Sequence, residues 1–419
     1  MSSIEERYWS TTAKSAAVAK RAERVMPGGD TRSVQQYRPY SLTIVRGEGP
    51  YLFDADGNRY IDLLGNYTSL VHGNAYPPIV ETIRDAVARG TAWPARSHAQ
   101  VELAELLRER VRSIEQVRFC NSGTEAGMLA AHVARRMTGR KYILMARHGY
   151  HGSYDDLEVG LAGNEGERTI LADFGDPSAF EALLSARGKE IAAVFLEPVM
   201  GSSGVVIPPA GFLARVREAA RRAGTVFVID EVITLRLAAG GAQQLFDVQP
   251  DLTMMGKIIG GGLPVGALGG SESIMSCLDP RNRGAMWHSG TFNGNPLTCA
   301  AGAVSVRELT QERIDTMDRL GERLARELKK AAMAVELPFS ARRIGSLMNI
   351  FFLNEPPPPT ISREDAKLIA DFHLAALNHG LFLAPRGLIA LSTVMTDELV
   401  TEIIERATRA LNDVASIAS

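Results

Sequence analysis

Five apolar runs in this chain are each followed at once by side chains that can do chemistry. The segments after the runs are residues 121–125, residues 148–152, Glu197, residues 230–232 and Lys257. The first segment supplies hydroxyl groups and a glycine that suit a phosphate. The other four supply an aromatic ring, two acids and an amine. Each residue type alone is more often structural, so the argument depends on the whole set.

Lys257 lies between the apolar run LTMM and a glycine-dense turn, and no other charged residue occurs from Thr253 to Gly270. Burying an ammonium there is costly, because desolvation favours the neutral amine. A lysine joined as an imine to an aldehyde cofactor avoids that cost. The alternative is a strand-end lysine whose head reaches solvent, which is the commoner arrangement.

Asp230 ends the apolar run TVFVI, where a carboxylate needs a cationic or hydrogen-bonding partner. A protonated pyridine nitrogen would be such a partner. Tyr150 can lie against one face of a planar ring, Val232 can cover the other face, and His151 can brace Asp230 from behind. The alternative for Asp230 is a cap on the next loop.

Ser122, Gly123 and Thr124 lie in CNSGTEAGMLAAHVA, at an expected strand-to-helix turn. Free backbone N–H groups and the positive end of a helix attract a phosphate at such a turn. A simple N-cap by Ser122 or Thr124 is the alternative.

Other chemistries fail on spacing. GGGLPVG does not have the GxGxxG spacing, no glycine lies five residues before Lys257 as a P-loop requires, and GxSxG is absent. The histidines and cysteines show no zinc-binding spacing, so no metal site is predicted.

Alternating strands and helices from about residue 100 to 300 must position these side chains. The predicted strands are VRFCNSG, KYILMARHGY, AAVFLEPV, TVFVIDEV and LTMMGK. Three predicted helices between them end at Gly139, Gly188 and Gly224, each expected to be a left-handed cap. This pattern predicts an α/β fold with a mostly parallel central sheet and helices on both faces, whose ligands gather at the carboxyl ends of the strands.

The flanking sequence predicts further elements. Residues 8–26 form an expected amphipathic helix, and a hairpin is expected around Asp56-Gly57-Asn58. After residue 305 we expect a long charged helix, the strand IGSLMNIFFL, a proline-rich loop, a helix, short strands around LFLAPRGLIALS and a final helix. The predicted organisation is an N-terminal segment (1–65) that packs with the small domain, a large cofactor-binding domain (66–305) and a smaller α+β domain (306–419).

Composition bounds the class of protein. The 419 residues carry a formal net charge of -2, which gives no reason to expect a nucleic acid or an anionic membrane as partner. No run approaches the roughly 20 apolar residues of a membrane span, and the N-terminus lacks the apolar core of a signal peptide. Three widely spaced cysteines suit a reducing compartment, so we expect a cytoplasmic protein.

The motifs NSGTEA, GYHG, EPVMGSSG, IDEV, GKIIGGGLPVGALGG and HSGTFNGNPL together resemble the class III, or omega, aminotransferases. These are fold type I enzymes that use pyridoxal 5'-phosphate (PLP). The resemblance implies that Lys257 is the Schiff-base lysine and Asp230 the partner of the pyridine nitrogen. It gives the remaining cofactor contacts to Tyr150, His151, Val232, Ser122, Gly123, Thr124, Glu197 near the phenolic oxygen, and Thr291 reaching the phosphate from the neighbouring subunit of a homodimer.

Within that class the chain resembles glutamate-1-semialdehyde 2,1-aminomutase and its transaminase relatives, but departs from the mutase in two places. The mutase-like DEVMTGFR reads DEVITLRLAAGGAQ here, with Leu235 in place of glycine, and the segment between His151 and Asp173 is shorter than expected. These features and APRGLIALS are similar to β-amino-acid aminotransferases of the β-phenylalanine type. That resemblance implies substrate-carboxylate contacts at Arg32 and Arg386, although a surface ion pair is the alternative for Arg386.

The implied reaction moves an amino group from a β-amino acid, or a related amine, to a keto acid such as 2-oxoglutarate or pyruvate. The alternative is the aminomutase, which moves an amino group within one five-carbon substrate.

Overall fold

The computed structural model of the chain describes residues 2–162, 166–359 and 365–418. By their internal contacts the residues divide into two units. We call Pro77–Ile314 the central unit, and Met1–Tyr76 together with Asp315–Ser419 the terminal unit. The contacts therefore place the boundaries at 76/77 and 314/315, where the sequence analysis expects them at 65/66 and 305/306.

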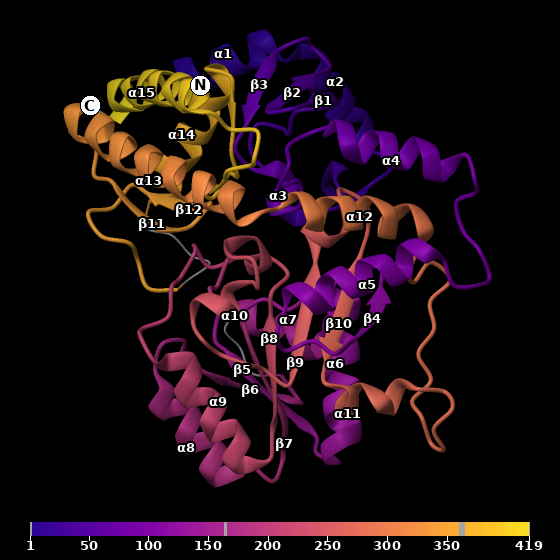
Figure 1. The fold of residues 1–419 in the computed structure, drawn as a ribbon. Coiled ribbons are helices and arrows are strands. Elements are labelled where there is room, and N and C mark those ends of the chain that lie inside the picture. The colour runs from indigo at the N-terminus through magenta and orange to yellow at the C-terminus, as the bar shows by residue number, and fades with distance from the viewer. Residues whose placement is uncertain (1, 163–165, 360–364, 419) are drawn as a thin grey trace. The chain divides into compact units, whose positions relative to one another are not determined.

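The central unit is built on a seven-stranded sheet (Figure 1). Across the sheet the strands are β4 (Gln116–Cys120), β10 (Gly266–Gly270), β9 (Leu252–Gly256), β8 (Val226–Asp230), β7 (Ile191–Leu196), β5 (Tyr142–Ala146) and β6 (Thr169–Ala172). Strands β9, β8, β7, β5 and β6 are parallel neighbours, and β10 is antiparallel to β4 and to β9. The predicted mostly parallel sheet is confirmed.

Helices cover both faces of this sheet, as predicted. The alternating side chains of β5 show why: Ile143 and Met145 join the buried cluster that contains α6 (Gly123–Thr138), whereas Leu144 joins the cluster of α8 (Pro177–Arg187) and α9 (Phe212–Ala223). The other helices of the unit are α4 (Pro77–Val87), α5 (His98–Arg110), α7 (Asp155–Ala162), α10 (Ala242–Leu245), α11 (Glu272–Met275) and α12 (Pro296–Glu308).

Strand β10 was not predicted, because its sequence, GALGG, has the composition of a turn. The strand needs glycine because of close approach to its neighbours. A Cβ at Gly266 would lie 1.9 Å from the carbonyl oxygen of Ser122. The glycines after Lys257 thus let a buried strand pass directly beneath the turn at the start of α6.

The helix caps were predicted correctly at two of three glycines. Gly139 and Gly224 are left-handed, with φ of 68° and 63°, as expected. The prediction for Gly188 was wrong, since its φ is -54°. Gly188 is required for space instead, because a Cβ there would lie 2.3 Å from the carbonyl oxygen of Leu184.

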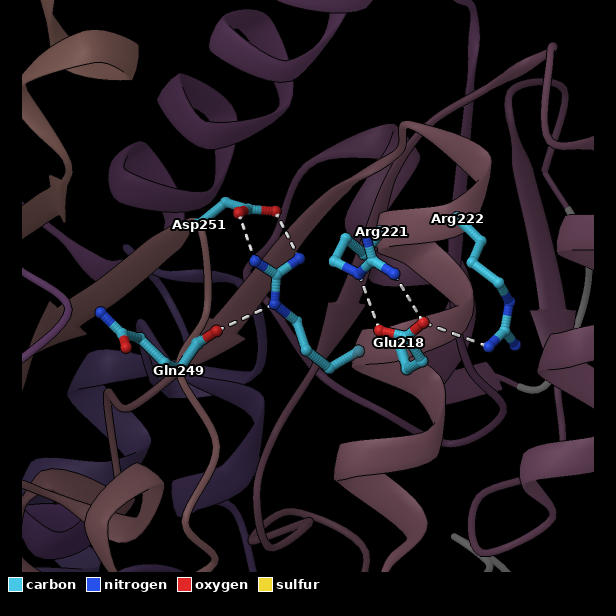
Figure 2. Close-up of polar contacts among 6 residues, drawn as sticks. Glu218, Arg221, Arg222, Gln249 and Asp251 are labelled. Carbon is cyan, nitrogen blue, oxygen red and sulfur yellow. Dashed lines mark hydrogen bonds and ion pairs between the residues drawn. The ribbon is translucent and has the colours of Figure 1, made fainter.

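A polar cluster fixes α9 to the segment that leads into β9 (Figure 2). Arg217 donates two hydrogen bonds to Asp251, of 3.1 and 2.7 Å, and a third to the carbonyl oxygen of Gln249. Asp251 also accepts the backbone N–H of Phe227 in β8. Asp251 therefore joins α9 and β8 to the start of β9, the strand that Lys257 follows.

The terminal unit contains two small sheets. The first has the order β1 (Ile44–Glu48), β2 (Tyr51–Asp54), β3 (Arg59–Asp62) and β13 (Leu381–Phe382), and the second has β11 (Ser340–Ile344), β12 (Leu347–Phe351) and β14 (Leu388–Ala390). The predicted hairpin around residues 56–58 is confirmed as β2 and β3. Strand β13 pairs parallel with β3, so the N-terminal and C-terminal segments share one sheet.

The helices of this unit are α1 (Ser3–Thr11), α2 (Ala13–Ala22), the short turn α3 (Gly65–Thr68), α13 (Gln311–Ala334, which begins just before the boundary), α14 (Ala366–Asn378) and α15 (Asp397–Ala418). The prediction of one helix over residues 8–26 was wrong, because the chain leaves helical geometry at Thr12, whose hydroxyl bonds to the carbonyl oxygen of Tyr8. Part of the predicted proline-rich loop lies outside the described residues. Across the described part of the chain, no helix combines the length and apolar character needed to span a bilayer.

Candidate functional site

The predicted cofactor-binding residues of the central unit, apart from Thr291, gather at one edge of its sheet. Tyr150 and His151 follow β5, Glu197 follows β7 directly, Asp230 is the last residue of β8, and Lys257 follows β9. Because these four strands are parallel and adjacent in the sheet, their carboxyl ends meet at the same edge. The strand order thus brings together residues that are up to 107 positions apart in the chain.

Asp230 is a buried carboxylate with two defined contacts. Its Oδ2 lies 2.9 Å from Nδ1 of His151, and its Oδ1 accepts the backbone N–H of Val232 at 2.9 Å. The His151 ring is buried and packs edge-on against Phe195. Among the described residues, Nε2 of His151 has no hydrogen-bond partner. The carboxylate is therefore held in one orientation from behind.

Glu197 is also buried, and both of its oxygens accept backbone N–H groups. Oε1 accepts from Tyr150 at 3.0 Å and Oε2 from Gly201 at 2.9 Å. The pKa of Glu197 is raised to about 7. Burial is the main cause, the charge of Asp230 adds to it, and the charge of His151 opposes it. Glu197 thus connects the loop of Tyr150 to the loop of Gly201, a contact that was not predicted from the sequence.

The turn at the start of α6 has features of both alternatives from the sequence, a simple N-cap and a phosphate-binding turn. Ser122 is the N-cap, since its Oγ accepts the backbone N–H of Glu125 at 3.1 Å, and the Glu125 carboxylate in turn accepts the backbone N–H of Asn121. The backbone N–H groups that follow lie at the positive end of a 16-residue helix. Thr124 accepts the backbone N–H of Ser153 at 3.2 Å, which joins this turn to the Tyr150 loop.

Val232 links the turn to the lysine. A Cβ at Gly123 would lie 3.2 Å from a methyl of Val232, and a Cβ at Gly256 would lie 3.5 Å from the other. Gly256 immediately precedes Lys257. The side chain of Val232 therefore packs against the backbone of both glycines and joins the start of α6 to the end of β9.

Lys257 itself has an uncommon backbone conformation. It is half-buried and begins a short 3-10 helix (Lys257–Gly260) with φ of 49°. Left-handed geometry costs a side chain with a Cβ of the order of 1–2 kcal/mol, and such strain is concentrated at functional positions. The conformation marks Lys257 as different from an ordinary strand-end lysine.

The two predicted carboxylate-binding arginines lie near one tyrosine in the terminal unit. Arg32 donates a hydrogen bond of 3.0 Å to Oδ1 of Asn66, and its guanidinium lies 5.6 Å from the centre of the Tyr67 ring. Burial raises the pKa of Tyr67, and the positive charges of Arg386 and Arg32 oppose that rise. Sequence reasoning missed Asn66 and Tyr67.

Thr291 is exposed in the loop before α12. Two residues further on, Asn293 accepts a hydrogen bond of 2.8 Å from the Asn121 side chain. The loop that carries Thr291 is thus anchored beside the start of α6 in the same chain.

Comparison with known proteins identifies the family. Residues 33–411 match the family described as aminotransferase class-III. The chain belongs to the class III aminotransferases. A glutamate-1-semialdehyde 2,1-aminomutase from Thermomicrobium roseum is 39% identical over 419 residues, which cover 94% of this aminotransferase and 97% of the relative.

Two solved structures are also close to this aminotransferase. A β-phenylalanine aminotransferase from Variovorax paradoxus has a TM-score of 0.90 and 34% identity, and the match covers 96% of this chain and 94% of that one. A transaminase solved with PLP bound has a TM-score of 0.91 and 33% identity, with 97% and 99% covered. The predicted fold type I architecture is confirmed.

PLP is the cofactor of this aminotransferase, and its substrates are small amino and keto compounds. The residues at the sheet edge fit the cofactor's chemical groups. A phosphate suits the start of α6, and a protonated ring nitrogen suits the buried Asp230 carboxylate that His151 holds.

Proposed function

We propose that this aminotransferase takes the amino group of a β-amino acid and passes it to a keto acid such as 2-oxoglutarate or pyruvate. The observation that carries the proposal is the proximity of Arg32 and Arg386 to one phenol, that of Tyr67. A planar guanidinium binds a carboxylate through two parallel hydrogen bonds. Donor and acceptor both carry a carboxylate, and in the proposal the two arginines together bind these carboxylates.

In the proposed mechanism PLP, when bound, supplies an electron-accepting ring that stabilises negative charge on the carbon next to the amine. Lys257 would hold the cofactor through its aldehyde group. When the amine of Lys257 is free, its Nζ would move the proton held at the amine-bearing carbon of the substrate.

The remaining residues hold and orient the ring. Asp230, fixed by His151, would favour the protonated form of the ring nitrogen. Tyr150 and Val232 would cover the two faces of the ring. The segment of Ser122, Gly123 and Thr124 would bind the phosphate through backbone N–H groups, and Glu197 positions the loop of Tyr150 by accepting its backbone N–H.

The proposal includes a cytoplasmic homodimer in which Thr291 reaches the phosphate site of the partner. The exposure of Thr291 supports this arrangement, as do two large apolar side chains in the same loop, Trp287 and Phe292, which are 92% and 58% exposed. The site would then be complete only in the dimer.

The aminomutase is the alternative, and the 39% identical relative that bears this name favours it. Two observations in this chain argue against it. Leu235 stands where the mutase-like motif has glycine, and it lies buried in the short 3-10 helix Thr234–Leu237. The segment between His151 and Asp173 is also short for the loop that covers the mutase substrate.

A spectrum of the PLP-loaded protein tests the proposal. We expect β-phenylalanine or another β-amino acid to bleach the visible band of the lysine-bound cofactor, and 2-oxoglutarate or pyruvate to restore it. Arg386→Ala should lose bleaching by β-amino acids and keep bleaching by simple amines. If β-amino acids leave the band unchanged while glutamate-1-semialdehyde is rearranged without any keto acid, the mutase alternative is correct.

A further inference from the structure

Glu231 lies between Asp230 and Val232 and has no part in the mechanism described above. Its side chain is fully buried, with 0% exposure. Burial of a carboxyl group is costly unless its oxygens find hydrogen-bond partners. The groups that bind this acid therefore show which part of the site it organises.

The carboxyl group of Glu231 holds both ends of the loop formed by residues 232–241. Near the start of the loop, Oε2 accepts the hydroxyl of Thr234. At the end of the loop, Oε2 accepts the backbone N–H of Ala242 at 3.1 Å, and Oε1 accepts the backbone N–H of Gln243 at 2.7 Å. The loop therefore closes on a single side chain.

The backbone at the end of this loop approaches the carboxyl group closely. Gly241 has φ of 79°, and a Cβ there would lie 2.6 Å from Oε1 of Glu231. Glycine suits both the conformation and the close contact. The carbonyl oxygen of Glu231 also accepts the backbone N–H of Leu235 at 3.1 Å. The backbone and the side chain of Glu231 therefore fix the same loop.

A buried polar network continues from Glu231 to β9. The amide nitrogen of Gln243 donates hydrogen bonds of 3.4 Å to Oε1 of Glu231 and to Oγ1 of Thr253. The amide oxygen of Gln243 accepts the hydroxyl of Ser113 at 2.6 Å, and the hydroxyls of Ser113 and Thr253 lie 2.9 Å apart. Thr253 belongs to β9, the strand that leads to Lys257. The network therefore couples the loop to β9.

The contacts of Glu231 suit a carboxylate and not an amide. Oε2 faces the donors of Thr234 and Ala242, and Oε1 faces two N–H donors of Gln243. Burial raises the pKa of Glu231, and these hydrogen bonds lower it. An amide of the same size would turn its own N–H groups toward one of the two pairs of donors. Glu231→Gln therefore breaks the arrangement without leaving a cavity.

We propose that Glu231 is a positioning residue for the cofactor ring, because it fixes the loop that carries Val232. Its carboxyl group holds Thr234, two residues beyond Val232, and the Val232 methyl groups pack at the start of α6 and the end of β9. Loss of the clamp frees Val232 to shift against the ring. This inference rests on the proposed position of the ring between Tyr150 and Val232.

Visible circular dichroism of the PLP-loaded protein reports the orientation of the ring, and titration of the apoprotein with PLP gives its affinity. We expect Glu231→Gln to change the dichroism of the cofactor band and to weaken PLP binding about tenfold, because two donors lose their acceptor. Thr234→Val keeps the volume of the side chain and removes one donor, so it should change the band and weaken binding about threefold. This variant carries the test if Glu231→Gln does not fold.

Thr225→Val is the matched control, because it removes the same hydroxyl group at the other end of β8. The buried Oγ1 of Thr225 donates to the carbonyl oxygen of Ile191 at 3.1 Å. We expect the control to lower the urea midpoint of unfolding as Thr234→Val does, because each loses a buried hydrogen bond. Only the control should retain the dichroism and the PLP affinity of wild type.

Two clamp variants, Glu231→Gln and Thr234→Val, that keep the wild-type band and PLP affinity would overturn the inference, whatever their stability. Asp230→Asn distinguishes this outcome from a failure of the proposed ring position. If Asp230→Asn changes the band and the clamp variants do not, only the positioning role is lost. If none of the three changes it, the ring lies elsewhere and the inference is overturned together with the proposed site.

Discussion

At the scale of single residues, Glu197 shows how a buried acid can organise a site from behind. Its two oxygens hold the backbone of Tyr150 and Gly201, and burial raises its pKa from 4.5 to about 7. The folded state therefore binds a proton more tightly than the unfolded chain. The contribution of this group to stability is fully present below pH 4.5 and is lost as the pH rises through 7.

We predict that wild type without cofactor loses roughly 2–3 kcal/mol of unfolding free energy between pH 5 and pH 8 relative to Glu197→Gln, which has no such proton to lose. Urea unfolding of both proteins at the two pH values measures this difference. Glu405→Gln, on an exposed residue of α15, is the control and should follow wild type. Parallel pH dependence of Glu197→Gln and wild type would show that the acid is not perturbed in this way.

Lys257 carries the largest expected effect of any single side chain. We predict that Lys257→Ala lowers transamination at least about a hundredfold, because both the covalent attachment and the proton transfer are lost. Reduction of the imine should fix PLP to Lys257 of the wild type, and mass spectrometry should detect this linkage. The variant should show no such linkage. Lys189→Ala, on an exposed residue, should retain both properties.

The position of these residues could be predicted from sequence, whereas their partners could not. Apolar runs mark strands, so the placement of Asp230 and Lys257 at strand ends followed from the pattern. The two N–H partners of Glu197 and the surroundings of Arg32 depend on loop conformation. Asn66 and Tyr67 are left-handed without being glycine, and no sequence pattern indicates that geometry.

At the scale of elements, the left-handed turn Gly65–Thr68, labelled α3 in Figure 1, depends on Asp62. We predict that Asp62→Ala costs roughly 2–4 kcal/mol of unfolding free energy, because two backbone N–H groups and the Asn74 amide lose a buried acceptor. Urea unfolding measures the cost, and Asp62→Asn, which retains one acceptor oxygen, should lose less. A change in Asp62→Ala within about 0.5 kcal/mol would mean that the turn does not need this acid.

Helix α14 contains a histidine that should make the terminal unit sensitive to acid. Burial lowers the pKa of His373 from 6.5 to about 3, so its contribution to stability is complete above pH 6.5 and is lost as the pH falls toward 3. We predict that wild type loses roughly 2 kcal/mol more than His373→Phe between pH 7 and pH 5. Denaturant unfolding at both pH values tests this, with His98→Gln on an exposed residue as the control.

The elements that sequence reasoning missed share a physical cause. Strand β10 consists largely of glycines that allow close approach, and the break between α1 and α2 falls at Thr12, whose hydroxyl also bonds to Tyr40. Local propensity does not contain either effect, because each depends on a neighbour. The long alternating segments were predictable because their periodicity reflects burial on both faces of a sheet.

At the scale of the whole molecule, the proposed dimer makes a testable prediction. The protein at micromolar concentration should sediment with twice the chain mass of 45.4 kDa. Thr291→Ala should weaken PLP affinity about three- to tenfold, the effect of one lost hydrogen bond, and leave the dimer intact. Thr11→Ala, on an exposed residue of α1, should leave the affinity unchanged. A sedimenting species of single-chain mass that still binds PLP fully would exclude a shared site.

The parallel pairing of β3 with β13 has a consequence for synthesis on the ribosome. Ile61 is joined to Leu381, so the first sheet of the nascent chain lacks its fourth strand until some 320 further residues have emerged. Residues 77–314 are contiguous and can complete their own core earlier. Proteolysis of stalled chains of increasing length should find protection of this middle segment first. Until the fourth strand has emerged, Ile61 and Leu63, which are buried in the folded chain, lack part of the structure that covers them.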